Sequence, residues 1–378
     1  MFNRLQKLQG LSKESCFLWG PRQTGKSTLL KRLFPNAPYY DLLLSEEFER
    51  LNRHPSLLRE ELAYSSYRGS VIIDEVQKIP QLLDEIQWLI VNENRSFILC
   101  GSSARKLKRG GGNLLGGRAL RYQLYPFVSK EIPNFDLIKA LNNGLLPRHY
   151  LASDPHRLLQ AYIGDYLKEE IAAEALTRNI SAFTRFLEVA SFSNGEVVNY
   201  ENIARECGVS APTVKGYFQI LIDTLIGYLI PSYQKRPKRR VVQAPKFYFF
   251  DLGIANYLLK RGPVAYFSES FGRAFEHFVL QELVAHSHYS EKQYTISYWR
   301  TTSRFEVDFI LGDDVALEIK STEQVQSHHL VGLRAFCQEY KPKKTIIVSM
   351  DKKPRIIGQI HIMPWEMFLE QLWGGKII

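Results

Sequence analysis

The sequence GPRQTGKS at residues 20–27 decides how the rest of the chain is interpreted. It has the spacing G-x-x-x-x-G-K-S, follows an apolar stretch (CFLW, 16–19) and runs into a segment of helical character that begins near Lys26. Gly20 and Gly25 allow backbone conformations that other residues disfavour, so successive N–H groups can turn inward around a polyphosphate. The positive end of the following helix adds to that field. The stretch therefore predicts a strand, a phosphate-binding loop and a helix.

Two side chains of this loop have predicted chemical roles. We expect Lys26 to reach the β- and γ-phosphates of a nucleoside triphosphate, and the hydroxyl of Ser27 to ligate Mg²⁺. The alternative is a glycine-containing turn between a strand and a helix that matches the motif by coincidence. The residues expected to surround the phosphates are Gly20, Pro21, Arg22, Gln23, Thr24, Gly25, Lys26, Ser27 and Thr28.

A second stretch, SVIIDE at residues 70–75, is an apolar run that ends in two acids. This pattern suits a buried parallel strand whose carboxyl end faces a ligand crevice. There Asp74 would hold Mg²⁺, directly or through a water, and Glu75 would orient and deprotonate the attacking water. Alone it would also fit an ordinary strand followed by an acidic turn. Together, the two stretches predict binding of ATP or GTP.

Length and composition set broader limits. A chain of 378 residues is long enough for two or three domains, and its formal charge of +10 favours an acidic partner, with nucleic acid the first candidate. The amino-terminal MFNRLQKLQG lacks the apolar core of a signal peptide, and no apolar run approaches the roughly 20 residues of a membrane span. We therefore expect a cytoplasmic protein without a membrane partner. Reduced thiols are expected of the four cysteines, which lack metal-type spacing: Cys16, Cys100, Cys207 and Cys337.

Residues 1–130 alternate strand and helix signals, which predicts a parallel sheet with helices on both faces. The strand FILCGSS (97–103) ends in Ser102 and Ser103, where a hydroxyl could sense the γ-phosphate; serine is also a common turn residue. A glycine-rich stretch then leads to Arg118, just before the strand ALRYQLY. We expect Arg118 to reach a phosphate of its own or a neighbouring subunit, where it would stabilise charge on the transferring group. The alternative is a surface arginine.

Residues 131–180 have a helical pattern and could form a lid over a nucleotide. The following part has the spacing of a helix–turn–helix, in which Gly208 ends one helix and Ser210 caps the next. A predicted β-ribbon (227–250) completes a winged helix. Five basic residues at its tip would contact DNA phosphates, although winged helices also bind proteins and basic runs are usually solvated. These residues are Lys235, Arg236, Lys238, Arg239 and Arg240.

The carboxyl-terminal part holds a second constellation of charged residues. If the turn 312–314 joins the strands FEVDFIL (305–311) and VALEIKS (315–321), alternation places Glu306, Asp308 and Ile310 on one face. Asp308 then lies opposite Glu318, and Glu306 opposite Lys320. Facing carboxylates repel each other, and a divalent cation between them would remove that penalty, as in metal-dependent phosphodiester hydrolysis. The alternative is an ordinary Glu306–Lys320 pair with Asp308 and Glu318 solvated.

In this site Lys320 would polarise the attacking water or the scissile phosphate. Glu276, on the predicted helix SFGRAFEHFVLQELVAH, is a further candidate ligand of the cation. The predicted metal-binding carboxylates are therefore Glu276, Asp308 and Glu318.

The motifs GPRQTGKST, VIIDEVQ, ILCGSS and GGR, followed by GRAFEHFVLQEL, YWRT, EVDFIL and ALEIKS, resemble the AAA+-like P-loop ATPases of bacteria and archaea. The resemblance covers nearly the whole chain. It implies an α/β fold with a P-loop NTPase domain (1–130), a helical lid with a winged helix (131–265), and an α/β domain similar to PD-(D/E)XK nucleases (266–378).

The resemblance also implies roles for individual residues. Lys26, Ser27, Asp74 and Glu75 take the ATPase roles, and Arg118 is the arginine of the GGR motif. Glu276, Asp308, Glu318 and Lys320 take the nuclease-type positions. The chain departs from that pattern where Val307 replaces the proline before the aspartate. The segment GLLPRHY (144–150) only loosely resembles a Gly-Pro element, which leaves the role of Arg148 open.

We therefore expect an ATP-binding, Mg²⁺-dependent ATPase that couples nucleotide state to DNA engagement, in a homo-oligomer. Adenine is expected from the resemblance alone, because no residue can be singled out that reads the base. The alternative is a nucleotide-gated switch that binds a protein and does not cleave DNA.

Overall fold

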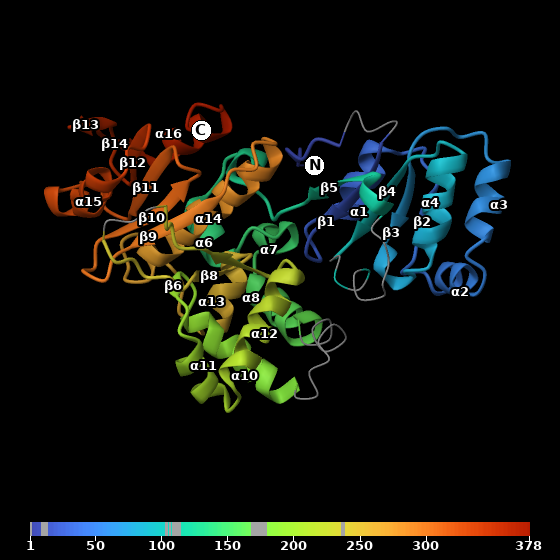
Figure 1. The fold of residues 1–378 in the computed structure, drawn as a ribbon, viewed down its shortest axis with the longest axis horizontal. Helices are drawn as coiled ribbons and strands as arrows, with labels where there is room; N and C mark the ends of the chain where they lie inside the picture. Colours follow the sequence, from blue (N-terminus) through green and yellow to red (C-terminus); the bar gives the residue numbers. More distant parts are fainter. Residues whose placement is uncertain are drawn as a thin grey trace. The chain divides into compact units, whose positions relative to one another are not determined.

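The computed structural model describes residues 2–8, 14–102, 105, 107, 115–167, 180–235 and 239–378. The chain forms two compact units (Figure 1). Unit 1 comprises Met1–Phe127 with Asp223–Ile226, and unit 2 comprises Val128–Ile222 with Gly227–Ile378. The division into three domains stays a prediction.

Unit 1 is built on a five-stranded sheet in which all neighbouring strands run parallel. Spatially the order is β2-β3-β4-β1-β5, so β1 lies between strands that are distant in sequence. At such a point the connections leave in opposite directions, and a ligand crevice opens at the carboxyl ends of the strands. The strands are β1 (Ser15–Trp19), β2 (Tyr39–Asp41), β3 (Val71–Asp74), β4 (Phe97–Gly101) and β5 (Ala119–Gln123).

Helices cover both faces of this sheet, as predicted. One core cluster joins alternate residues of the strands, such as Phe17, Ile73 and Leu99, to the helices that follow β2 and β3. The intervening strand residues, such as Leu18, are buried too, as is Leu30 of the helix after the loop. The helices of unit 1 are α1 (Lys26–Leu33), α2 (Ser45–Arg53), α3 (Leu57–Tyr64) and α4 (Leu82–Asn92), with short 3₁₀ turns η1 (Val76–Lys78) and η2 (Leu115–Gly117).

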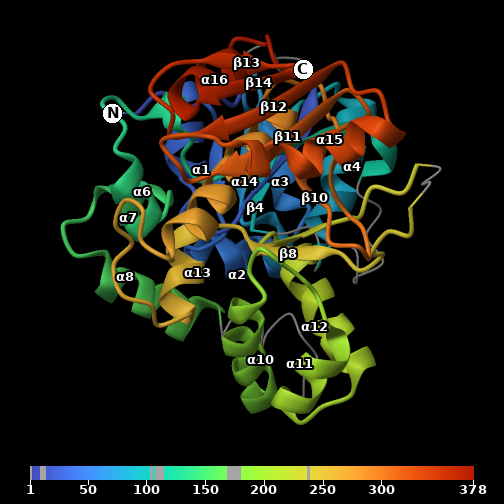
Figure 2. The same ribbon diagram turned by 90° about the vertical axis from the view of Figure 1, so that its left-hand side faces the viewer.

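Unit 2 begins with short helices and continues into a helical cluster (Figure 2). A small sheet in the order β6-β8-β7 accompanies this cluster. The predicted helix boundaries at Gly208 and Ser210 are confirmed: Gly208 has φ +67°, and the Ser210 hydroxyl accepts the N–H of Thr213 at 3.3 Å. The elements are η3 (Ser129–Glu131), α6 (Leu137–Asn143), α7 (Pro147–Leu151), α8 (Pro155–Ala161), the π-helix η4 (Tyr162–Leu167), α10 (Ile180–Phe192), β6 (Glu196–Val197), α11 (Tyr200–Cys207), α12 (Ala211–Asp223), β7 (Gly227–Ile230), β8 (Lys246–Phe249) and α13 (Leu252–Leu258).

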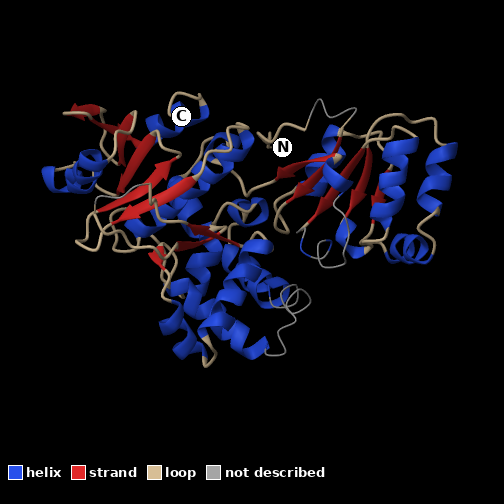
Figure 3. Cartoon of the chain, in the orientation of Figure 1, coloured by secondary structure: helices blue, strands red, loops and turns tan. Residues whose placement is uncertain are grey.

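The second half of unit 2 is a six-stranded mixed sheet in the order β13-β14-β12-β11-β10-β9 (Figure 3). Leu333 and Phe336 of α15 pack with Val307 and Ile310 in one core cluster, so α15 covers one face. Helix α14 packs on β11, and α16 on β12 and β14. The elements are α14 (Phe271–Tyr289), β9 (Ile296–Arg300), β10 (Glu306–Leu311), β11 (Val315–Lys320), η5 (Ser327–Leu330), α15 (Val331–Glu339), β12 (Lys344–Ser349), β13 (Arg355–Ile357), β14 (Ile360–Pro364) and α16 (Trp365–Trp373).

The register of β10 against β11 is the predicted one, with Phe309 opposite Leu317 and Leu311 opposite Val315 across the turn 312–314. The predicted alternation along β10 is wrong. A bulge between Val307 and Ile310 shifts the pairing with β9, and both of these residues join the same core cluster. Because a bulge inserts one residue into the strand, Glu306 and Ile310 do not share a face as predicted.

The predicted β-ribbon also differs from the structure. Strands β7 and β8 pair, but the described parts of their connection lie along the edge of β9: Tyr233 N–H donates to Tyr298 O at 2.7 Å, and Val242 N–H to Arg300 O at 2.8 Å. The open edge of β9 supplied the backbone partners that the sequence pattern did not reveal. All four cysteines are free, as expected. Among the described residues, no helix combines the length and apolarity that crossing a membrane requires.

Candidate nucleotide-binding site

The loop between β1 and α1 has the shape that its glycines predict, for two different reasons. Gly25 adopts φ +90°, a left-handed conformation that other side chains rarely adopt. Gly20 is required by space instead, because a Cβ there would lie 2.4 Å from the carbonyl oxygen of Leu124. The expectation of an unusual backbone conformation thus holds at Gly25, whereas Gly20 permits close packing against the end of β5.

Lys26 lies inside this loop and is almost completely buried. Its ammonium donates to the carbonyl oxygens of Gly20 at 2.6 Å and Pro21 at 3.1 Å, and the hydroxyl of Thr24 donates to Pro21 O at 2.9 Å. The other predicted loop residues, Arg22, Gln23 and Thr28, are exposed. The loop therefore surrounds the positive charge that would meet a polyphosphate.

Arg4 belongs to none of the motifs, but it forms hydrogen bonds with the phosphate loop. Its guanidinium donates to Thr24 O at 2.6 Å and to Tyr125 O at 2.5 Å, and it lies over the ring of Phe127. The acceptors are backbone carbonyls, so the side-chain types in the sequence could not predict these hydrogen bonds. Arg4 thus ties the amino-terminal segment to the phosphate loop and to the chain after β5.

Asp74 lies at the carboxyl end of β3, directly across from the loop. Its carboxylate accepts the hydroxyl of Ser27 at 2.6 Å and also the hydroxyl of Tyr39, on the neighbouring strand β2. Burial and the Asp74 carboxylate raise the pKa of Tyr39, which stays a donor. Hard oxygen atoms of a carboxylate and a hydroxyl side by side are the donor set that Mg²⁺ prefers. The residues present therefore fit the metal, with Ser27 and Asp74 as the predicted holders.

Glu75 follows in a left-handed backbone conformation (φ +59°). The amide nitrogen of Gln77 donates to the Glu75 carboxylate and to the Ser102 hydroxyl, the latter at 3.1 Å. Burial raises the pKa of Glu75, and the nearby ammonium of Lys26 opposes this shift. Gln77 belongs to the motif VIIDEVQ, but the sequence predicted no role for it. Its contact with Glu75 depends on the backbone turn at residue 75, which the sequence pattern does not show.

Arg118 is exposed, but it cannot reach the phosphates of its own loop. The register pairs Ser15 with Ala119 and Trp19 with Gln123, so Arg118 lies at the amino ends of the strands. The phosphate loop leaves the carboxyl end of β1, four residues farther on, or about 13 Å at 3.3 Å per residue. The expectation that Arg118 serves its own nucleotide is therefore wrong, and service to a neighbouring subunit stays a prediction. Ser103 lies outside the described residues.

In unit 2 the predicted cation ligand Glu276 is held by lysine and tyrosine. It accepts from Tyr248 at 2.5 Å and from Lys246 at 3.3 Å, and Lys246 is also 2.7 Å from Glu306. Burial disfavours the charge of Lys246, but the carboxylate of Glu276 and its neighbours outweigh it and raise the lysine pKa. Lys246 was not predicted, since it comes from β8, far from Glu276 in the sequence.

Asp308 and Glu318 are both buried, so the alternative in which they are solvated is wrong. Glu318 accepts the ammonium of Lys320 at 2.5 Å, and Asp308 accepts the N–H of Ile319 at 2.7 Å. Burial raises the pKa of both carboxyls, with Glu276 adding to the shift at Asp308 and Asp308 adding to it at Glu318. The predicted repulsion is therefore present.

The alternative expectation, an ordinary pair between Glu306 and Lys320, is wrong. Lys246 and Lys320 lie beside the carboxylates, and Glu306 pairs with Lys246 and Arg300 rather than Lys320. Within the described ranges, no group of three or more His, Cys, Asp and Glu side chains is arranged to hold a metal ion. Lysines lie beside these carboxylates in the structure, and a cation site formed by Glu276, Asp308 and Glu318 stays a prediction.

Replacing Asp308 by asparagine should make unit 2 more stable at alkaline pH. A raised pKa in the folded state means that protonation stabilises the fold below the ordinary aspartate pKa, and that this stability is lost as the pH rises through the raised value. Asparagine keeps the acceptor for Ile319 N–H and does not titrate. For each unit of pKa elevation we expect a gain of about 1 kcal/mol, or about 2–4 °C in Tm. Thermal unfolding near pH 5 and near pH 8 measures it; an equal Tm difference at both would contradict the prediction.

Of the predicted basic tip, Lys235 pairs with Asp313 at 2.5 Å and Arg239 with Glu339 at 2.6 Å. Arg240 is exposed, and Arg236 and Lys238 lie outside the described residues. Within the described residues, part of the basic charge is thus neutralised by the chain itself, which the local sequence could not show because both acids come from the carboxyl-terminal sheet region.

Three family models match the chain. Residues 12–133 match the AAA domain, 134–265 a domain of unknown function (DUF8612), and 271–368 a domain of unknown function (DUF4143). An uncharacterized protein of Mycobacterium tuberculosis is 25% identical over 321 residues, which cover 81% of this chain and 70% of that protein. An uncharacterized protein of Mycobacterium bovis gives the same values.

Two solved structures are similar at low identity. A Walker-type ATPase of Pyrococcus abyssi is 15% identical, with 64% of this chain and 90% of that chain covered and a TM-score of 0.43. The Orc1 protein of Aeropyrum pernix, in complex with DNA, is 16% identical, with 65% and 86% covered and a TM-score of 0.23. Neither likeness carries an argument about activity. The match of residues 12–133 and the geometry around Lys26 and Asp74 agree, and the chain therefore carries an AAA-like domain with the fold of P-loop ATPases.

Proposed function

We propose that unit 1 binds ATP with Mg²⁺ and hydrolyses it, and that the bound nucleotide controls the engagement of DNA by unit 2. One observation carries the first part. The carboxyl edge of a parallel sheet brings together the ammonium of Lys26, the hydroxyl of Ser27 and the carboxylates of Asp74 and Glu75. Transfer of a phosphoryl group to water needs a cation that binds the phosphates, oxygen ligands for a metal ion and a base that accepts a proton.

The residues of this site divide the work. Lys26 and the loop N–H groups bind the β- and γ-phosphates, and Ser27 and Asp74 hold Mg²⁺, which when bound neutralises charge on these phosphates. Glu75 accepts a proton from the attacking water, while Gln77 fixes the direction of its carboxylate. Ser102, tied to the same amide, is positioned to respond to the γ-phosphate. In this proposal Arg118 acts on the nucleotide of a neighbouring copy in a homo-oligomer.

Phosphate release from ATP by the purified full-length chain, with and without DNA, tests the proposal. We expect Mg²⁺-dependent release that DNA changes. Absence of release in the presence of Mg²⁺ would overturn the ATPase, and release that no DNA alters would remove the coupling.

Gln77→Leu should slow hydrolysis about 10- to 100-fold, the factor that a hydrogen bond to a charged group is worth. Because the Gln77 bond lowers the pKa of Glu75, its loss should also move the acid limb of the kcat profile to higher pH. Ser102→Ala serves as the comparison for the pH profile only: it leaves the Gln77–Glu75 bond in place, so its acid limb should not move even if its rate falls. The profile of kcat against pH is the measurement; a slower enzyme with an unmoved limb would assign Gln77 a role in folding only.

The DNA part of the proposal is supported by the order of elements α10, β6, α11, α12, β7 and β8, which is that of a winged helix. A second function is favoured by a specific observation. Lys235 and Arg239 are engaged in ion pairs, and Lys215 is the only basic residue in α12. Such a surface suits a protein partner, with the nucleotide acting as a switch.

A salt series distinguishes the two functions. Phosphate contacts release counterions, so DNA affinity should fall steeply as salt rises. A flat response would favour the protein-binding switch.

For the carboxyl-terminal cluster of Asp308, Glu318 and Lys320, we propose phosphodiester cleavage. Its support is the burial of Asp308 and Glu318 beside Lys320 in the predicted register. The test is nicking of supercoiled plasmid with Mg²⁺ or Mn²⁺. Any such nicking should disappear in Asp308→Ala, and nicking that persists in this variant would place the chemistry elsewhere.

A further inference from the structure

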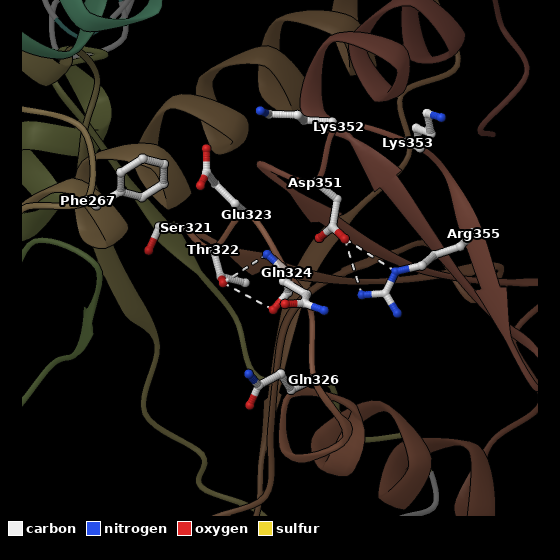
Figure 4. A pocket seen from close by; sticks show the side chains of 10 residues that line it. All are labelled: Phe267, Ser321, Thr322, Glu323, Gln324, Gln326, Asp351, Lys352, Lys353 and Arg355. Atoms are coloured by element: carbon white, nitrogen blue, oxygen red, sulfur yellow. Dashed lines mark hydrogen bonds and ion pairs between the residues drawn. The ribbon is translucent and has the colours of Figure 1, made fainter.

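A polar pocket of about 980 Å³ opens in unit 2, where the parallel strands β11 and β12 end (Figure 4). It lies directly after Lys320, the last residue of β11, but shares no residue with the charged cluster described above. Carboxyl ends of parallel strands are a common place for ligands. The pocket is lined by Phe267, Ser321, Thr322, Glu323, Gln324, Gln326, Asp351, Lys352, Lys353 and Arg355.

The charged groups of the pocket are not equivalent. Arg355 is tied to the buried Asp351 at 3.2 Å, so this pair shapes the wall and adds no net charge. Lys352 and Lys353 are exposed and, among the described residues, have no ion-pair partner. The ammonium of Lys352 points toward the side of the pocket on which Phe267 lies (Figure 4). Glu323 is the opposing exposed carboxylate, so the free charges sum to +1 and favour an anion.

Neutral hydrogen-bonding groups accompany these lysines. Ser321 lies next to Gly272, in the first turn of α14, where an added Cβ would be 3.1 Å from the serine hydroxyl. The side-chain amides of Gln324 and Gln326 belong to exposed residues of the pocket rim. Such groups donate to the oxygens of a phosphate without demanding a particular base.

Phe267 gives the pocket an aromatic wall. The residue is 53% exposed, although its ring contacts that of Phe271 at 5.9 Å between centroids. Its backbone has φ +61°, which is strained for a residue with a Cβ, so the surrounding structure holds this ring at the pocket edge against a local cost. An exposed aromatic face beside free cations is the arrangement that binds single nucleic-acid strands, where bases stack and the backbone follows positive charge.

We propose that this pocket binds a single DNA strand, with phosphates at Lys352 and Lys353 and one base stacked on Phe267. In a duplex the faces of the bases are covered by their neighbours, so an isolated ring can stack only on a strand that is single. The proposal deepens the proposed engagement of DNA and rests on it, but it requires neither ATP hydrolysis nor the segment between β7 and β8.

The test uses the full chain and a fluorescein-labelled oligothymidylate, followed by fluorescence anisotropy over a salt series. Phe267→Ala should weaken binding about 5- to 100-fold, and Phe267→Trp should restore it. Replacing Lys352 and Lys353 together by alanine should lower the salt slope by about 1.4, or about 0.7 for each phosphate contact. Glu323→Gln should strengthen binding, because it removes the opposing charge.

The control Lys341→Ala removes an exposed lysine outside the pocket and should leave binding unchanged. Arg240→Ala, which alters the exposed arginine after β7, separates this pocket from the first proposed DNA contact.

Equal losses for a duplex and for the single strand in Phe267→Ala would overturn the stacking. An acidic peptide or polyphosphate that competes equally well in the wild type and in Phe267→Ala would make the pocket a general anion site and overturn the proposal. Oligothymidylate binding that persists in Lys26→Ala, a variant expected to bind ATP weakly, would support the pocket even if the ATPase failed.

Discussion

Glu75→Gln is expected to bind ATP with nearly unchanged affinity and to hydrolyse it about 100- to 10,000-fold more slowly, the range by which a positioned base accelerates proton transfer. Glutamine has the same length and can still accept the amide of Gln77, so the left-handed turn at position 75 and the fold around it should remain. What is lost is the carboxylate that takes the proton of the attacking water. Calorimetric titration with ATP and Mg²⁺, together with single-turnover hydrolysis, separates binding from chemistry.

The pH profile of the wild type sharpens this prediction. Burial raises the pKa of Glu75, so the base is protonated, and the rate falls, at a higher pH than for an ordinary glutamate. Glu75→Gln should lack this acid limb. Glu93→Gln, an exposed carboxylate of the same unit, is the control and should change neither rate nor profile. Hydrolysis by Glu75→Gln at the wild-type rate would show that another group is the base.

Lys26→Ala is expected to weaken ATP binding about 30-fold or more, because removal of one partner from a buried charge pair costs 2–5 kcal/mol and leaves the phosphates without their cation. Lys26 is only 6% exposed, and its ammonium is directed into the loop by the carbonyls of Gly20 and Pro21. No other lysine lies in the loop, and its second cation, Arg22, is exposed. Calorimetric titration measures the loss.

Lys31→Ala, which removes an exposed lysine from the same helix, is the matched control and should retain the affinity. Circular dichroism and thermal unfolding of both variants show whether the fold is kept. Unchanged ATP affinity in a folded Lys26→Ala protein would contradict the assignment of the loop.

The fold of unit 1 was predictable because local signals agreed there. The alternation of short apolar strands with helices required a parallel sheet, and the phosphate loop and Asp74 both follow strands, so they meet at one edge. Arg118 shows the limit of this reasoning. Its motif suggested a phosphate, but only the register of β5 against β1 reveals that it lies at the opposite edge. Gln77 and Arg4 were missed for a related reason, since their partners are set by a turn and by backbone carbonyls.

The charged cluster of unit 2 was predictable only in part. Turn length gave the correct register of β10 and β11, because three residues suffice to reverse the chain. The bulge in β10 left no mark in the sequence pattern. Lys246 could not be connected with Glu276 and Glu306 either, because a buried lysine in an apolar strand reads as an ordinary strand residue until the strand is placed. Residues that are distant in the sequence therefore set the charge balance around these carboxylates, where spacing alone had suggested a metal ion.

The position of Arg4 has a practical consequence for anyone who isolates the nucleotide-binding part. The family match begins at residue 12, so a fragment cut at that boundary keeps every motif residue and discards the guanidinium that holds Thr24 and Tyr125. Such a fragment would lack the hydrogen bonds that Arg4 donates to the phosphate loop and to the chain after β5. Loss of affinity in it would then report a missing support rather than a missing motif, and fragments intended to be active should include the seven residues from Phe2 to Leu8.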